Sequence, residues 1–367
     1  MSLVEENASK STIRDVARLC GVSIKTVSRV LNGESGVKRE TRDRVTRIIN
    51  EMGYFPHAGA RSMRGKPINR VGLTLAAPPT EAPLSLRLLD LLFTELYSSL
   101  GMKGNYLCLD LNPYAEHNNT DYARGLWEQL VAGLVIAGPL SPGDPVIERI
   151  HRSGHPYVAI GRLASFPECS SASVDFEEGA YLSAKHLLSR GHRNIALLMS
   201  IKGYEPGLER KRGYSQALAE AGIGLDESLV GDVQFSSSSI SEAVSRLLQN
   251  QNISALIDCT GAEDAESIRR GARQAGREIG RDLDLVAWTY TQGAVVFPEA
   301  AAHVWIPIRE AAHDGIRQFS DWFLGSRTEP VRVLYPPTLY ETKDAVEVPQ
   351  LVPVFDLSFL FPVSDRS

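Results

Sequence analysis

The sequence is poor in cysteine and lacks long apolar runs. Its 367 residues include four isolated cysteines, with no Cys-x-x-Cys pair and no His/Cys spacing typical of a zinc site. Scattered thiols fit a reducing cytoplasm better than a disulfide-stabilised fold. The first ten residues, MSLVEENASK, contain no apolar segment of a secretory signal, and no apolar run reaches the ~18 residues of a membrane helix. We therefore expect a cytoplasmic protein with no bound metal and no membrane partner.

Common enzyme motifs are also absent. The chain has no GxSxG nucleophile elbow, no P-loop, no HExxH zinc motif and no GxGxxG after a strand. Lone histidines such as His186 and His192 are more often structural than catalytic. These absences argue against an enzyme and against a bound cofactor.

Charge is distributed unevenly along the chain. Residues 1–66 carry 13 Lys and Arg against 7 Asp and Glu, whereas residues 67–367 carry 26 against 37. The length allows two or three compact cores. This asymmetry predicts a nucleic-acid-binding head on an acidic body; the alternative is chance variation within a short segment.

A first short helix is indicated after Ser11. Thr12 can cap it, and Asp15 three residues later completes a variant capping box. Apolar residues then recur at the spacing of one buried helix face, at Ile13, Val16, Ala17 and Cys20. Gly21 breaks this pattern and can adopt the positive φ of a tight turn.

Two further helices follow the turn. Ser23 can cap the second helix, and its apolar face consists of Val27, Val30 and Leu31. The third helix runs from about Val37 to Met52. Two short helices joined by a Gly-containing turn are typical of a helix-turn-helix; the alternative is a generic helical hairpin.

The second helix directs two cations away from its apolar face. At about 100° per residue, Lys25 and Arg29 lie roughly 150–170° from the centre of that face, and Ile24 lies on its shoulder, about 65° away. Lys and Arg suit the guanine acceptors of the major groove, whereas nearby Ser and Thr hydroxyls suit phosphates. The pattern predicts that this helix reads DNA.

The segment TIRDVARLCGVSIKTVSRVLNG resembles the signature of the lac-repressor-like (LacI/GalR) transcription regulators, and GYFPHAGARSMRGK resembles their hinge. The similarity extends over about residues 11–343. It implies an N-terminal all-α helix-turn-helix domain with a hinge helix, followed by an α/β two-lobed periplasmic-binding-protein-like sensor domain with parallel sheets. The implied limits are a disordered arm at 1–10, the DNA-binding domain at 11–56, the hinge helix and linker at 57–68, the sensor domain at 69–345 and a tail at 346–367.

The resemblance also implies particular DNA contacts. Bases would be read by Ile24, Lys25 and Arg29. Phosphates would be contacted near Thr12, Ser23, Thr26, Ser28 and Asn32. On DNA, the hinge would fold and enter the minor groove with three residues, His57, Ala60 and Met63. Met63 stands where the family usually has a wedging Leu, and His57 stands where it usually has Asn.

From residue 70 onward, apolar strands alternate with amphipathic helices. Strands separated by helices of this length indicate right-handed βαβ units and a parallel sheet. The segment is too long for one such sheet, so two are expected. The resemblance divides them into lobe 1, about 69–163 and 305–328, and lobe 2, about 168–302 and 331–345.

An effector is implied in the cleft, at the carboxyl ends of the strands. The segment ERKRGYSQAL resembles the family's R-x-x-G pattern and places Arg210 there, where a guanidinium suits hydroxyls or a carboxylate; the alternative is a surface arginine. Gly161 and Tyr204 also follow strands at this edge. The segment SASVDFEEGA resembles a structural strand-to-helix turn.

Several cleft positions depart from the family pattern. Thr289 stands where the family usually has Asp, and Thr260 stands where it has Asn. Ile306 replaces a frequent Gln. Trp288 and Trp305 flank these positions, and aromatic faces with few polar groups suit stacking on a sugar ring or an aromatic aglycone. A sugar or glycoside effector is therefore predicted; the alternative is that both tryptophans belong to the lobe core.

The tail at residues 346–367 extends past the family's usual end. Pro349, Pro353 and Pro362 argue against a tetramerising helix. We expect an extended arm that packs its phenylalanines on a lobe or a partner; the alternative is an unstructured end.

Together these patterns favour a sequence-specific regulator of transcription, a repressor in most members of such a family. It would bind near-palindromic double-stranded operator DNA as a homodimer or higher oligomer, controlled by a carbohydrate effector through allostery. The alternatives are a transcriptional activator and a cytoplasmic sugar-binding protein, and the DNA-binding head counts against the second of these.

Overall fold

The computed structural model of the chain contains two compact units, Met1–Ile68 and Asn69–Ser367, here called the head and the body. It describes residues 12–31, 35–52, 69–76, 86–110, 121–138, 140–200, 203–233, 237–261 and 265–344. The predicted arm at 1–10, Asn32, the hinge residues His57, Ala60 and Met63, and the tail at 346–367 lie outside these ranges. None of the described helices is long and apolar enough to cross a membrane.

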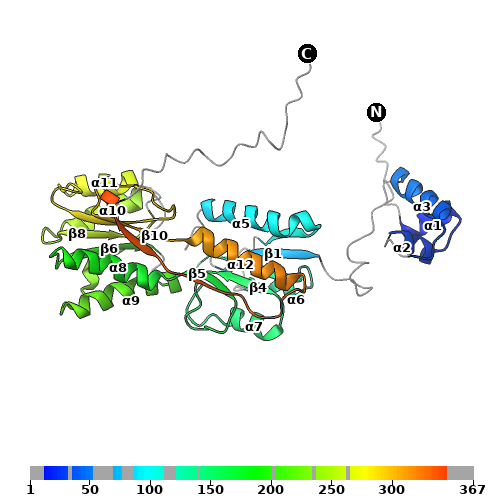
Figure 1. Ribbon diagram of the computed structural model, residues 1–367, viewed down its shortest axis with the longest axis horizontal. Helices are drawn as coiled ribbons and strands as arrows, with labels where there is room; N and C mark the ends of the chain where they lie inside the picture. The colour runs from blue at the N-terminus through cyan, green and yellow to red at the C-terminus, as the bar shows by residue number, and fades with distance from the viewer. Residues whose placement is uncertain are drawn as a thin grey trace, which may run out of the picture. The chain divides into compact units, whose positions relative to one another are not determined.

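The described part of the head contains three helices, α1 (Ile13–Cys20), α2 (Ile24–Leu31) and α3 (Arg39–Glu51) (Figure 1). The predicted capping box is present: Asp15 N–H donates to Thr12 Oγ1 over 3.3 Å, and Thr12 N–H donates to the Asp15 carboxylate over 3.0 Å. Gly21 ends α1 with a φ of 62°, as predicted. The three helices share one small core, formed by Val16, Ala17, Cys20, Val27, Val30 and Val45.

The body contains two six-stranded sheets, which define a first and a second lobe. Every strand pair of the first sheet is parallel. Its order is β11 (Arg332–Tyr335), β5 (Ser171–Val174), β4 (Tyr157–Ile160), β3 (Gly133–Ala137), β1 (Arg70–Leu75) and β2 (Tyr106–Asp110).

The second sheet is parallel except at one edge. Its order is β12 (Thr338–Glu341), β10 (Ala302–Trp305), β9 (Asp284–Thr289), β8 (Ala255–Asp258), β6 (Ile195–Ser200) and β7 (Val230–Val233). Only β12 is antiparallel to its neighbour. The expected pair of parallel sheets is thus confirmed.

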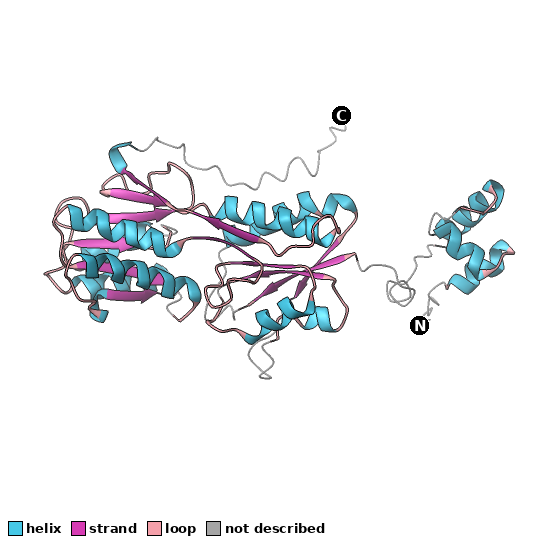
Figure 2. Cartoon of the chain, turned by 60° about the horizontal axis from the view of Figure 1, so that its bottom comes forward, coloured by secondary structure: helices cyan, strands magenta, loops and turns pink. Residues whose placement is uncertain are grey.

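Helices cover both faces of each sheet (Figures 1 and 2). On the first sheet, α5 (Leu86–Ser99) and α12 (Ile308–Phe323) pack on one face, and α6 (Arg124–Trp127) and α7 (Pro145–Ser153) pack on the other. On the second sheet, α8 (Phe176–Ser189) and α9 (Glu205–Glu220) cover one face, and α10 (Ser237–Leu248) and α11 (Ala265–Gln274) cover the other. Among the described residues of the body there are also three short 3-10 turns, at Gly101–Lys103, Glu227–Leu229 and Thr342–Asp344. Each lobe therefore has a core on both sides of its sheet.

The lobe boundaries differ from the prediction at two strands. Residues 171–174 and 332–335 were assigned to the second lobe, but β5 pairs with β4 and β11 pairs with β5, so both strands extend the first sheet. The first and third crossings between the lobes therefore come later than expected, after Val174 and between Tyr335 and Thr338. The second crossing, between Trp305 and Ile308, lies close to its expected place. The prediction was wrong at β5 and β11 because backbone pairing, and not the local apolar pattern, decides which sheet a four-residue strand joins.

The glycine of the R-x-x-G pattern has a packing role. A Cβ on Gly213 would lie 1.8 Å from the carbonyl oxygen of Glu177, so α8 and α9 approach closely only because this position has no side chain. Arg210 precedes Gly213 by one turn on α9. The close packing of α8 and α9 therefore also fixes the position of the Arg210 side chain.

Candidate DNA-binding face and effector site

The helix α2 has a buried face and an exposed face. Val27 and Val30 lie in the head core, and Lys25 is exposed. Ile24 is 39% exposed, which agrees with its expected place on the shoulder of the helix. Arg29 is half-buried. The exposed face of α2 thus combines a cation with a branched apolar side chain, the two kinds of group that contact guanine acceptors and thymine methyls.

Three of the predicted phosphate residues, Thr12, Ser23 and Thr26, lie at helix starts. Thr26 N–H donates to Ser23 Oγ over 3.1 Å, and the two hydroxyl oxygens are 2.9 Å apart. Thr12 caps α1. Ser23 and Thr12 are exposed, whereas Thr26 and Ser28 are half-buried. Helix N-termini carry partial positive charge and attract phosphates, so these hydroxyls both fix the helices and lie where an anion would be favoured.

The head is also basic as a whole. In its described part, nine Lys and Arg outnumber four Asp and Glu. Excess positive charge of this kind supplies the sequence-independent, salt-sensitive attraction to DNA. The charge and the shape of α2 therefore support the same partner.

The predicted effector residues lie at the carboxyl ends of strands in both sheets and at the start of α9. Thr260 follows β8, Thr289 ends β9, Trp305 ends β10 and Gly161 follows β4. Tyr204 is the residue before α9. Because carboxyl ends of parallel strands meet at the same edge, ligands of such folds bind there.

Arg210 is not a surface arginine. It is 4% exposed, and its guanidinium carbon lies 4.8 Å from the ring centre of Phe176 and 5.4 Å from that of Trp288. The two rings are stacked, 6.1 Å apart. Nη1 donates to the carbonyl of Ser200 over 3.4 Å, whereas the buried Nε has no hydrogen-bond partner among the described residues. Aromatic rings therefore hold Arg210 in place with part of its bonding capacity unused.

Trp288 has a different place from the one predicted. It is 0% exposed, and its indole N–H donates to Ser183 Oγ over 3.0 Å. Its ring belongs to the core of the second lobe, where it packs on Phe176 and contacts the Arg210 guanidinium. Trp288 therefore has no free ring face for a ligand. Trp305, in contrast, is half-buried, and its indole nitrogen has no hydrogen-bond partner within the described part of the chain.

The two threonines at the strand ends are engaged locally. Thr260 donates its hydroxyl to Asp258 Oδ1 over 2.6 Å, and Thr289 Oγ1 accepts from Thr291 N–H over 3.2 Å. Both are almost fully buried. Their hydroxyls shape the turns that follow β8 and β9.

The structure adds polar residues that the sequence did not single out. Arg162, which follows β4, lies 3.2 Å from Asp175 through Nη1 and 3.2 Å from Glu209 Oε1 through Nε. Ser165 donates to Glu205 over 2.8 Å. These contacts join a loop of the first lobe to α9 of the second. The available signal was the segment EPGLER, in which two glutamates stand four residues apart on a helix beside Arg210.

Glu209 is the most perturbed acid of this group. Its side chain is 0% exposed, and burial raises its pKa from the ordinary 4.5 to about 8. Arg162 and Arg212 lower the pKa, while Asp175 and Glu205 raise it. Desolvation outweighs the attraction of the nearby guanidiniums.

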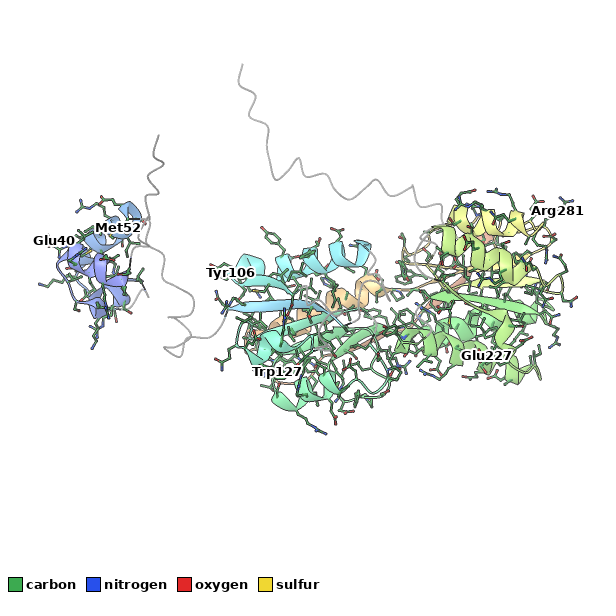
Figure 3. All side chains as sticks on the ribbon, turned by 180° about the vertical axis from the view of Figure 1, so that it is seen from behind. Glu40, Met52, Tyr106, Trp127, Glu227 and Arg281 are labelled. Carbon is green, nitrogen blue, oxygen red and sulfur yellow. The ribbon has the colours of Figure 1, made fainter. Side chains whose placement is uncertain are left out.

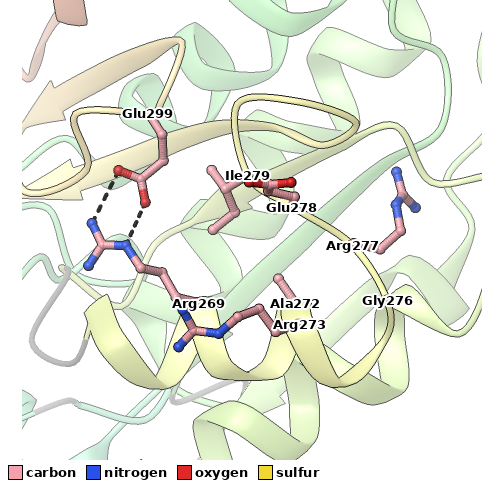
Figure 4. Close-up of a pocket in the computed structure, with 8 residues that line it drawn as sticks. All are labelled: Arg269, Ala272, Arg273, Gly276, Arg277, Glu278, Ile279 and Glu299. Atoms are coloured by element: carbon pink, nitrogen blue, oxygen red, sulfur yellow. Dashed lines mark hydrogen bonds and ion pairs between the residues drawn. The ribbon is translucent and has the colours of Figure 1, made fainter.

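A separate cavity of about 510 Å³ lies beside α11 (Figure 4). It is lined by three arginines, but each is already engaged. Arg269 bonds both oxygens of Glu299, Arg273 pairs with Glu266, and Arg277 pairs with the Asp282 carboxylate. Since its cations are neutralised by the protein itself, this cavity is a poorer ligand site than the cluster around Arg210.

An exposed recognition helix on a basic head, together with a polar cluster at the strand ends of a two-lobed body, defines a DNA-binding regulator with a sensor domain. A family model described as bacterial regulatory proteins, lacI family, matches residues 12–57, and one for a periplasmic binding protein-like domain matches residues 184–343. The chain is 30% identical over 332 residues to the HTH-type transcriptional regulator DegA of Bacillus subtilis (strain 168), covering 90% of this chain and 96% of DegA. The chain therefore belongs to the lacI family of bacterial regulatory proteins.

Other relatives agree with this assignment. The chain is 29% identical over 344 residues to the HTH-type transcriptional regulator CelR of Thermobifida fusca, covering 90% of this chain and 96% of CelR. A solved complex of the regulator CelR with cellobiose has a TM-score of 0.60 at 26% identity, covering 90% of this chain and 98% of that chain. The lac repressor dimer bound to operator and the anti-inducer ONPF has a TM-score of 0.72 at 21% identity, covering 92% and 100% of the two chains. The last comparison supports the fold.

Proposed function

We propose that this regulator binds a near-palindromic operator as a homodimer and represses transcription, and that a carbohydrate bound near Arg210 changes its affinity for DNA. The proposal of DNA binding rests on α2, which exposes Lys25 and Ile24 on one face and buries Val27 and Val30 on the other. The bases would be read by Ile24, Lys25 and Arg29, and the phosphates would be held near Thr12, Ser23, Thr26 and Ser28.

The carbohydrate part rests on the cluster at the strand ends. Arg210 is held by Phe176 and Trp288 with an unused donor, and a guanidinium of this kind suits sugar hydroxyls. The related regulator CelR has been solved with cellobiose. A ligand that contacts both lobes would favour one lobe arrangement, and this preference would be transmitted to the heads.

An apolar edge of the first lobe supports dimerisation. The strand β2 lies at the edge of its sheet and exposes Tyr106, Leu107 and Leu109; Tyr106, labelled in Figure 3, is 62% exposed. Phe93 and Tyr97 of the neighbouring α5 are also exposed. Unpaired edges and contiguous apolar surface mark association sites, so we propose that this face pairs two bodies.

Selection from random DNA tests the proposal. The purified full chain is incubated with random duplexes, and the bound fraction is sequenced after several rounds. A near-palindromic site with two half-sites about one or more helical turns apart is the expected result, because paired heads present two recognition helices. Enrichment of no sequence at all would contradict operator recognition, and a single asymmetric site would contradict the dimer.

A further inference from the structure

Glu209 is a buried carboxylate with an ion-pair partner but with no hydrogen bond to any described residue. It is 0% exposed, and neither of its oxygens has a hydrogen-bond partner in the described structure. Its ion-pair partner is Arg162, whose Nε lies 3.2 Å from Oε1. Buried polar atoms are nearly always hydrogen-bonded, so an exception at a ligand edge points to a group that is supplied from outside.

Arg210, the next residue on α9, has an unused hydrogen-bond donor. Arg210 is also buried, and its Nε is a donor without an acceptor. An unused acceptor and an unused donor therefore stand side by side in sequence at the start of the same helix. A hydroxyl group can donate and accept at once, whereas a phosphate or a carboxylate can only accept.

The charges around Glu209 favour the same chemistry. Asp175 and Glu205 are its acidic neighbours, and both raise its pKa. Arg162 is shared between Glu209 and Asp175, and Arg212 pairs with Glu177. An anionic ligand reaching Glu209 would meet these carboxylates in a poorly hydrated place, where like charges repel strongly.

We propose that Glu209 determines effector specificity: its carboxylate, ionised when the ligand binds, accepts hydrogen bonds from hydroxyl or ammonium groups of the sugar, and with Glu205 it then excludes phosphorylated and carboxylated sugars. This inference rests on the proposed carbohydrate effector. To that proposal it adds the chemical class of the effector, a neutral or amino sugar, and the residue that selects this class.

The test is a binding panel on the full chain. Thermal stabilisation and calorimetry are measured with cellobiose, maltose and lactose, with glucosamine, and with glucose 6-phosphate and glucuronate. Wild type is compared with Glu209→Gln, which keeps the shape and removes the charge, and with the control Glu178→Gln at an exposed position of α8. Because Arg162 keeps Asp175 as a partner, Glu209→Gln should still unfold cooperatively, and its melting curve verifies this.

We expect only neutral or amino sugars to bind, with a loss of tenfold or more in Glu209→Gln and no change in Glu178→Gln. Donors that reach Glu209 favour its ionised form, so binding should release protons into the buffer. That release is read from the calorimetric heat in two buffers of different ionisation enthalpy, and it should vanish in Glu209→Gln.

Three results would overturn the inference. The first is an anionic sugar that binds as tightly as its neutral counterpart. The second is a neutral sugar that binds wild type and Glu209→Gln equally with the same proton release. The third is no binding by any member of the panel; if the protein still selects an operator, this leaves the DNA-binding function standing and removes only the effector class.

Discussion

Arg162 of the first lobe and Glu209 of the second lobe form an ion pair, with 3.2 Å between Nε and Oε1. Two further contacts connect the same elements: Ser165 donates to Glu205 over 2.8 Å, and Glu205 N–H donates to the carbonyl of Leu140 over 3.0 Å. All three involve the first two turns of α9. The helix that carries Arg210 is therefore also a helix that joins the two lobes, and a ligand bound at Arg210, as proposed above, would act on the lobe arrangement.

The ionisation of Glu209 predicts a pH dependence of stability. Its pKa is about 8 when folded and near the ordinary 4.5 when unfolded. Between pH 4.5 and pH 8 the folded state holds one more proton than the unfolded state. The stabilisation that this group contributes is therefore complete below pH 4.5 and is lost as the pH rises through 8. The melting temperature of Glu209→Gln, which cannot ionise, should rise relative to wild type from pH 5 to pH 8.5.

The exposed variant Glu178→Gln serves as the control for this pH series, and its curve should stay parallel to that of wild type. Parallel curves for Glu209→Gln as well would mean that Glu209 titrates in the folded protein as it does in the unfolded chain.

The close approach of α8 and α9 predicts a strong packing effect at Gly213. In Gly213→Ala the new Cβ would lie 1.8 Å from the Glu177 carbonyl oxygen, so the helices must separate. Overpacking of this kind costs about 1–3 kcal/mol. The melting temperature should fall by several degrees, whereas Gly224→Ala, which meets nothing within 4 Å, should melt as wild type does. Equal melting temperatures would show that the helices are not held this closely.

The exposed edge of the first lobe predicts the oligomeric state. The double variant Tyr106→Arg/Leu109→Arg places two cations on the proposed dimer face, where their desolvation opposes association. Sedimentation should show a dimer for wild type and a monomer for the variant, with weaker operator binding. Leu130→Arg, at an exposed leucine outside β2 and α5, is the matched control and should remain dimeric. A dimeric double variant would place the interface elsewhere.

Local features of the sequence predicted the head well. The capping box of Thr12 and Asp15, the positive φ of Gly21 and the shoulder position of Ile24 depend on residues a few positions apart, so spacing alone determines them. The division into two parallel sheets follows from repeated βα units for the same reason.

Long-range pairing explains what the sequence could not supply. The strand β11 joins the first sheet through β5, which lies far earlier in the chain, and Arg162 meets Glu209 across 47 positions. The orientation of Trp288 depends on Ser183 and Phe176. None of these contacts leaves a periodic pattern, so the sequence pointed to Arg210, but its neighbours Arg162 and Glu209 became visible only in the fold.

The most direct test of base reading by α2 is a binding titration of wild type and Lys25→Ala against the selected operator, with every base pair of a half-site substituted in turn. Lys103→Ala, an exposed lysine of the body, is the control for lost charge. If Lys25 reads a base, the variant should lose about 1–3 kcal/mol of discrimination at one base pair of each half-site and keep it at the others. An equal loss of affinity for all sequences, with discrimination unchanged, would assign Lys25 to a phosphate and contradict base reading by this residue.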